Sequence, residues 1–74
     1  METKVRRIMA DILGLDPSLI TEGTAMDNTG TWDSLAHINL VTALEQEFGV
    51  SLEIEEIESM RSFTKIKSVL GPKI

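Results

Sequence analysis

The residues of this sequence best suited to chemistry are the adjacent pair Asp33 and Ser34. They stand where a segment rich in Gly, Thr, Asp and Asn gives way to helix-forming residues, so we expect the serine in the first turn of a helix. Unpaired backbone N–H groups and the helix dipole favour a phosphate on a hydroxyl at that place. An Asp-Ser pair there is also a common helix cap, worth about 1 kcal/mol. The pair alone therefore leaves two interpretations open, a structural cap and a hydroxyl that another enzyme can modify.

Two other groups of residues contain the residue types of a hydrolase triad or a calcium loop, but not the spacing of either site. Asp33, Ser34 and His37 contain the residue types of a hydrolase triad, but Ser34 and His37 lie one helical turn apart and no Gly-x-Ser-x-Gly elbow surrounds the serine. We interpret His37 as a core histidine bonded to the preceding loop, and Trp32 as a plug that holds this loop on the protein. The segment 27–30 lacks the alternating acids and final glutamate of a calcium loop, so no metal site is predicted.

Length and composition indicate one small domain, residues 1–74, because two cores would need about twice this length. Apolar residues make up 42%, which supports a packed core, but so small a domain leaves little room for an enclosed substrate pocket, and we do not expect an enzyme. The absence of cysteine excludes disulfides and thiolate metal sites. With no apolar run near the roughly 20 residues of a membrane span and no signal-peptide pattern, we expect a cytoplasmic monomer without a membrane partner.

The charge of −5 is unevenly distributed along the chain. Residues 16–60 contain no Lys or Arg and hold ten of the twelve acidic residues. Such a field repels nucleic acid and favours partners with basic patches. A solvated acidic face that only keeps the protein in solution is the alternative interpretation.

Apolar periodicity predicts an all-α fold, a small helical bundle of three longer helices and one short helix. The longer helices are expected at residues 3–14, 35–48 and 63–70, and the short acidic one at 53–60. A long loop, residues 15–32, separates the first two helices, and loops of this length in compact domains are usually functional. Its apolar residues are expected to hold it on the core: Leu19, Ile20, Ala25 and Met26.

The helix at 35–48 has an apolar face and a polar stripe. Leu35 falls on the polar stripe, at the start of the helix and next to Ser34, so its side chain is expected to be exposed. The residues expected on the buried face are Leu40, Val41, Ala43, Leu44 and Phe48.

Several of these features together resemble the acyl carrier protein family. They are Asp33-Ser34-Leu35 at the helix start, Glu45-Gln46-Glu47-Phe48-Gly49 at its far end, and the acidic segment behind it. The similarity extends over nearly the whole chain, with an amphipathic first helix, a long first loop, a short third helix and a closing fourth helix. The tripeptide is weak by itself, whereas the combination with the second motif and the right total length is specific.

The resemblance implies that Ser34 receives 4′-phosphopantetheine from coenzyme A. A separate phosphopantetheinyl transferase would use the hydroxyl to attack the pyrophosphate of the coenzyme, and Asp33 would cap the helix and guide that enzyme and its metal ion. The thiol of the attached arm would carry acyl groups as thioesters, while the protein itself catalyses nothing. The absence of cysteine agrees with this, because the sulfur arrives with the cofactor.

The resemblance also implies a surface for acyl-loading and acyl-processing enzymes with basic patches. Carriers of primary fatty-acid synthesis typically have acids early in the second helix, where this sequence has Ala36 and Asn39. We therefore expect a free-standing carrier of a specialised pathway. The residues expected to contact partners are Leu35, Ile38, Glu45, Glu47, Glu53, Glu55 and Glu56.

Two alternatives remain at the level of sequence. A carrier of aminoacyl or peptidyl groups requires the same serine and differs mainly in its partners. A helical adaptor without a prosthetic group would bind a basic partner through its acidic face, and Ser34 would then be dispensable. The acyl cargo, the pathway, the partner enzymes and the place of the acyl chain, inside the bundle or in solvent, are left open.

Overall fold

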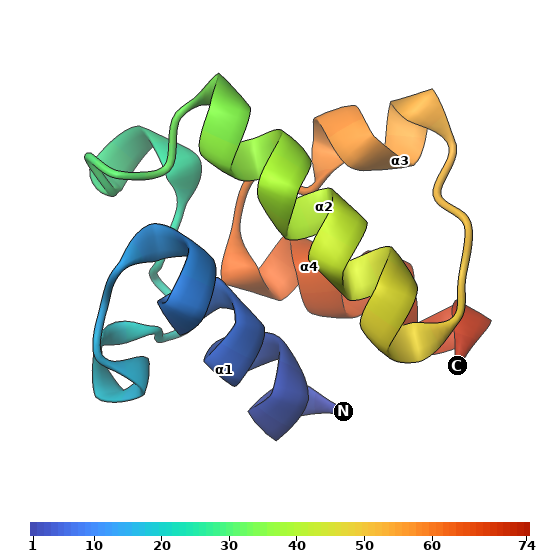
Figure 1. The fold of residues 1–74 in the computed structure, drawn as a ribbon, viewed down its shortest axis with the longest axis horizontal. Helices are drawn as coiled ribbons and strands as arrows, with labels where there is room; N and C mark the ends of the chain where they lie inside the picture. The colour runs from blue at the N-terminus through green and yellow to red at the C-terminus, as the bar shows by residue number, and fades with distance from the viewer.

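Four α-helices make up most of the protein, which a computed structural model describes over residues 1–74 (Figure 1). Three 3₁₀ turns, η1 (Pro17–Leu19), η2 (Met26–Asn28) and η3 (Gly71–Lys73), complete the regular structure. The predicted all-α bundle of three longer helices and one short helix is confirmed. The helices are α1 (Glu2–Leu13), α2 (Ser34–Phe48), α3 (Ile54–Ser59) and α4 (Phe63–Leu70).

The helix ends follow local capping chemistry, which is why the sequence predicted them to within a residue or two. Gly14 and Gly49 end α1 and α2 in the left-handed conformation, with φ of 69° and 62°, which glycine adopts without a steric penalty. Ser62 begins α4, and its hydroxyl accepts a hydrogen bond of 3.1 Å from the Lys65 backbone N–H. None of the helices is both long and apolar enough to cross a membrane.

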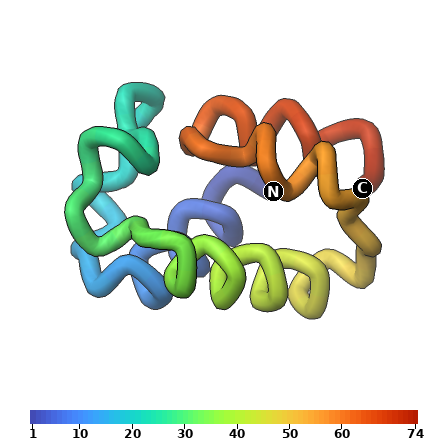
Figure 2. Tube along the Cα trace, turned by 90° about the horizontal axis from the view of Figure 1, so that it is seen from above, coloured from blue at the N-terminus to red at the C-terminus, as the bar shows by residue number.

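A single hydrophobic core lies between the three longer helices, with contributions from the loop and from the end of α3. Figure 2 shows α2 on one side of the molecule and α4 on the other, with the first loop (residues 14–33) closing one end. On α2 the buried face is narrower than predicted, because Ala43 and Phe48 are only half-buried. The core residues are Val5, Met9, Ala10, Leu13, Ile20, Trp32, Leu40, Leu44, Met60, Phe63, Ile66 and Leu70.

The first loop is held on the core by residues that differ in part from those predicted. Ile20 is buried as expected, but Leu19 is 60% exposed, so its predicted anchoring role is wrong. Leu19 ends the turn η1, and its backbone carbonyl, rather than its side chain, fastens the loop by accepting a hydrogen bond from the Thr24 hydroxyl. Thr24 is 7% exposed, and a buried hydroxyl with satisfied hydrogen bonds replaces the missing apolar contact.

The loop is also paired with the segment between α3 and α4. The Met26 N–H donates to the Arg61 carbonyl at 2.8 Å, and the Phe63 N–H donates to the Thr24 carbonyl at 3.0 Å. These two bonds form an isolated antiparallel bridge between Ala25 and Ser62. The last part of the loop, which leads into α2, is therefore fixed against the C-terminal half of the protein.

Candidate functional site

The sequence left open whether the Asp33-Ser34 pair caps a helix or offers a hydroxyl for modification. In the structure each residue takes one of these roles. Asp33 is the N-cap of α2, and its carboxylate accepts a hydrogen bond of 2.8 Å from the Ala36 N–H. Ser34 is the first residue of the helix, it is exposed, and its hydroxyl forms no hydrogen bond within the chain. Because the cap is supplied by Asp33, the hydroxyl of Ser34 is free to react.

The histidine one turn further on is held from both sides. Trp32 Nε1–H donates to His37 Nδ1 at 3.0 Å, and His37 Nε2 lies 2.8 Å from the carbonyl oxygen of Ile57. An indole N–H only donates and a carbonyl only accepts, so the ring is neutral with its proton on Nε2. The predicted bond from His37 to the preceding loop is confirmed, and Trp32, 2% exposed, is the predicted plug.

The contact with Ile57 was not predicted, because it joins residues 20 positions apart that no local pattern connects. It fastens α3 to α2. His37 is half-buried rather than part of the core proper. Neither ring nitrogen is available to Ser34, which leaves a serine–histidine hydrolase without its base.

An open groove of about 360 Å³ lies beside Ser34, between the first turns of α2 and the end of α3. We call it the Ser34 groove. Its lining combines apolar side chains with one cation and one acid. It consists of Met26, Ser34, His37, Ile38, Ile57, Glu58 and Arg61.

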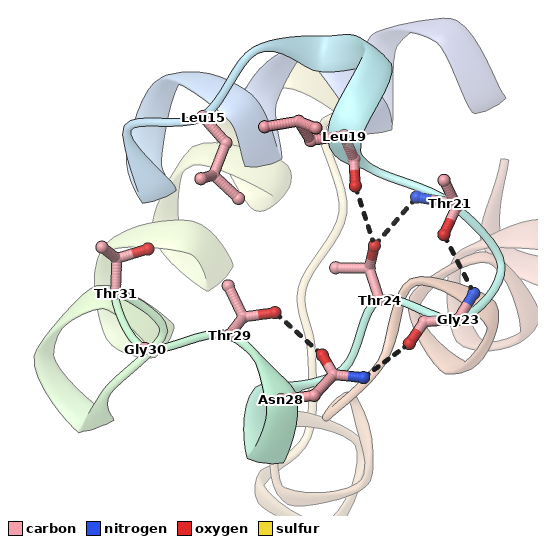
Figure 3. A pocket seen from close by; sticks show the side chains of 9 residues that line it. All are labelled: Leu15, Leu19, Thr21, Gly23, Thr24, Asn28, Thr29, Gly30 and Thr31. Carbon is pink, nitrogen blue, oxygen red and sulfur yellow. Dashed lines mark hydrogen bonds between the residues drawn. The ribbon is translucent and has the colours of Figure 1, made fainter.

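A larger hollow, about 540 Å³, lies over the first loop and does not include Ser34 (Figure 3). Its polar groups are used to order the loop itself: Thr24 Oγ1 accepts from the Thr21 N–H at 2.9 Å, and Asn28 Nδ2 donates to the Gly23 carbonyl at 2.8 Å. The Oδ1 atom of the same Asn28 side chain accepts from the Thr29 hydroxyl. The polar groups of this hollow therefore stabilise the first loop, which leads to Asp33.

The residues expected to contact partners separate into free and internally bonded groups. Leu35 is 68% exposed, as predicted, and Ile38 and, on α3, Ile54 are 61% and 71% exposed. Glu53 and Glu55 are exposed. Leu35 and Ile38 thus form an exposed apolar surface on the first turns of α2, and Glu53, Ile54 and Glu55 form an apolar and acidic one at the start of α3.

Three of the acids expected to contact partners, Glu45, Glu47 and Glu56, have bonds within the chain. The Glu45 carboxylate accepts from the Leu52 N–H at 2.9 Å, and Glu47 pairs with Lys4 at 3.5 Å. Glu56 accepts from the Glu53 N–H and pairs with Lys73 at 3.1 Å. The Glu53 N–H and then Lys73 lower the pKa of the Glu56 carboxyl. These acids fix the ends of α2 and α3.

The first turn of α2 fits a covalently attached phosphate group. The backbone N–H groups of Ser34 and Leu35 have no partner in the chain, and both lie beside the free Ser34 hydroxyl. Such donors at a helix N-terminus, together with the helix dipole, stabilise an anion. No group of three or more His, Cys, Asp or Glu side chains is arranged to hold a metal ion.

Comparison with known proteins agrees with this arrangement. The family model described as phosphopantetheine attachment site matches residues 3–70. An acyl carrier protein of Syntrophobacter fumaroxidans is 40% identical over 72 residues, which cover 96% of this chain and 88% of the relative. Acyl carrier proteins of Thermosynechococcus vestitus and Petrotoga mobilis are each 32% identical over 71 residues, 96% of this chain and 88% and 84% of the relatives. The chain therefore belongs to the acyl carrier protein family and bears 4′-phosphopantetheine as its covalent prosthetic group.

Proposed function

We propose that the protein carries acyl groups as thioesters on a 4′-phosphopantetheine arm attached to Ser34. The observation that supports this serine is its free, exposed hydroxyl in the first turn of α2, beside two unpartnered backbone N–H groups and with the cap left to Asp33. The prosthetic group supplies the thiol that forms thioesters, in a chain that has no cysteine.

Attachment uses the chemistry of Ser34 and of a phosphopantetheinyl transferase. The Ser34 oxygen attacks the pyrophosphate of coenzyme A, a new P–O bond forms to the serine, and the bond to the adenosine bisphosphate breaks. The proton of the hydroxyl passes to a base of the transferase, because both nitrogens of the nearby His37 are already bonded. Asp33 keeps the first turn of α2 in place during this reaction.

The chain acts as a carrier rather than a catalyst, and its partners supply the catalysis. The exposed large apolar side chains nearest Ser34 in sequence, Leu35 and Ile38, provide an apolar contact for acyl-loading and acyl-processing enzymes. Glu53 and Glu55 on the adjoining α3 region suit basic patches on these partners. A monomer acting in the cytoplasm is consistent with brief encounters of this kind.

Intact-mass measurement after incubation with coenzyme A and a broad-specificity transferase tests the attachment residue. The wild type and Ser68→Ala, a control at an exposed serine on α4, are expected to gain the mass of phosphopantetheine. Ser34→Ala is expected to gain nothing while retaining its helical circular dichroism, because Asp33 still caps α2. Loading of Ser34→Ala would show that another serine carries the arm.

A further inference from the structure

The Ser34 groove contains one positively charged side chain, that of Arg61. Arg61 is exposed, and its guanidinium forms no hydrogen bond or ion pair with any group of the chain. Glu58 lines the same groove, but the two side chains are not paired. A cation without a partner therefore lies in the groove that begins at the reactive serine.

Four of the other six Lys and Arg side chains are engaged elsewhere. Lys67 pairs with two carboxylates, and Lys4 and Lys73 each pair with one. Arg6 donates to the Ile20 carbonyl at 3.0 Å. Residues 16–60, which include Ser34 and all of α2, contain no Lys or Arg. Arg7 and Lys65 have no partner either, but neither lines the Ser34 groove, so Arg61 is the cation placed to act on a group attached to Ser34.

The backbone of Arg61 is held in a fixed position. Its carbonyl accepts from the Met26 N–H at 2.8 Å, and its N–H donates to the Ser59 carbonyl at 2.9 Å. These bonds tie the residue between the turn η2 and the end of α3, next to the bridge of Ala25 and Ser62. The side chain thus starts from a defined point, and only its own rotamers have to be ordered by a ligand.

Attachment of a phosphodiester adds a negative charge to a place that is already acidic. The Asp33 carboxylate caps the same helix turn, Glu58 lines the groove, and the whole chain carries −5. Backbone N–H groups at the helix start offset part of this charge. A guanidinium offsets more, because its planar fork matches two oxygens of a phosphate.

From these observations, and resting on attachment at Ser34, we propose that Arg61 binds the phosphodiester of the prosthetic group and so positions the start of the arm along the Ser34 groove. Met26, Ile38 and Ile57 give the groove apolar surface on which the methylene stem of the arginine and the arm can lie. Arg61 acts here as a positioning residue and takes no part in thioester chemistry.

A thermodynamic cycle tests this pairing without any activity assay. The melting temperature is measured for the apo and the loaded protein, each as wild type and as Arg61→Gln, after intact mass has shown complete loading. The gain in melting temperature on loading is expected to be about 2–4 °C larger in the wild type, as for one partly exposed ion pair in a domain of this size. Arg61→Lys is expected to retain part of this difference, since it keeps the charge and loses the fork.

Arg7→Gln is the matched control, because Arg7 is an exposed arginine of α1 that lines none of the hollows. It is expected to leave the gain on loading unchanged. At about 1 M salt, where screening acts within about 3 Å, the difference between wild type and Arg61→Gln is expected to shrink. Equal gains in fully loaded wild type and Arg61→Gln would overturn the role of Arg61 and leave attachment at Ser34 intact, whereas a wild type that cannot be loaded would overturn both.

A second measurement needs no variant. In the NMR spectrum of the wild type, the Nε–H signal of Arg61 is expected to shift on loading, and that of Arg7 is expected to stay in place. An Arg61 signal that does not move would overturn the proposal even if a variant failed to fold.

Discussion

Where α1, the first loop and α4 meet, charged groups are paired with one another, whereas around Ser34 they are left free. Lys67 on α4 bonds to Glu2 of α1 and to Glu22 of the loop, and its ammonium lies 4.5 Å from the centre of the buried Phe63 ring. Near Ser34, by contrast, two backbone N–H groups and the guanidinium of Arg61 have no partner.

The paired region stabilises the fold, whereas the free region is left available for binding. The paired region holds three distant segments together and offers little to a ligand. The free region has few polar contacts of its own beyond the Asp33 cap and the His37 hydrogen bonds. Its unsatisfied donors and its exposed apolar side chains, Leu35 and Ile38, remain available to a prosthetic group and to partner proteins.

In the free region, the His37 ring forms two hydrogen bonds, to Trp32 and to Ile57. Removing them is expected to have the largest effect of the tests proposed here. His37→Leu deprives the Trp32 N–H of its acceptor and the Ile57 carbonyl of its donor. The free energy of unfolding, measured with urea, is expected to fall by about 1–3 kcal/mol, the cost of leaving such groups unsatisfied. Amide exchange in α3 is expected to become faster.

Asn39→Leu is the control, because Asn39 is exposed on the same helix and has no side-chain partner. It is expected to change stability by less than about 0.5 kcal/mol. If His37→Leu were as stable as this control, the histidine would not hold α3, and α3 would depend on Ile57 and Met60 packing alone.

Local sequence patterns predicted some of these features and not others. Caps such as Asp33 and Gly49, and the apolar stripes of α1 and α4, follow from neighbours within one or two turns and were predicted. The bond from His37 to Ile57 and the placement of Arg61 beside Ser34 depend on how α3 folds back over α2, which no local pattern contains. Leu19 was misassigned because hydrophobicity alone does not tell which way a 3₁₀ turn faces.

A prediction with an effect of intermediate size concerns the choice of partner enzymes and uses the early turns of α2. They carry no acid, and Asn39 and Thr42 are exposed there, whereas Ala36 packs against the core. We expect acyltransferases of primary fatty-acid synthesis to use this carrier poorly. Asn39→Glu with Thr42→Glu is expected to raise the rate of acyl transfer by up to about tenfold, through added ion pairs with a basic patch.

The neutral pair Asn39→Gln with Thr42→Gln is the control for shape and is expected to leave the rate unchanged. Melting temperatures of both variants are expected to stay near that of the wild type, because the two positions face solvent. A wild type that already serves as well as a primary-pathway carrier would rule out the specialised role.

The smallest expected effect is on the loss of stability at acidic pH, and it concerns Glu22 in the paired region. The hydrogen bond from Lys67 holds the pKa of the Glu22 carboxyl below its ordinary value of 4.5, with smaller help from Thr64 and Arg6. A carboxyl whose pKa is lowered in the folded state stabilises the protein above its unfolded pKa, and this contribution is lost as the pH falls through the folded value.

Glu22→Gln should therefore make the fall in stability below about pH 4.5, followed by urea unfolding, shallower than in the wild type. The slope does not vanish, because Asp16 and Glu56 also have lowered pKa values, caused chiefly by backbone N–H groups of Ser18 and Glu53. Glu55→Gln, at an exposed acid of α3 whose carboxylate has no partner in the chain, should leave the slope as it is in the wild type. Because the Glu22 side chain is 64% exposed, the difference should also diminish with added salt. Identical slopes for Glu22→Gln and Glu55→Gln would remove the distinction between a paired and a free side of the molecule, since the acids of both sides would then behave alike.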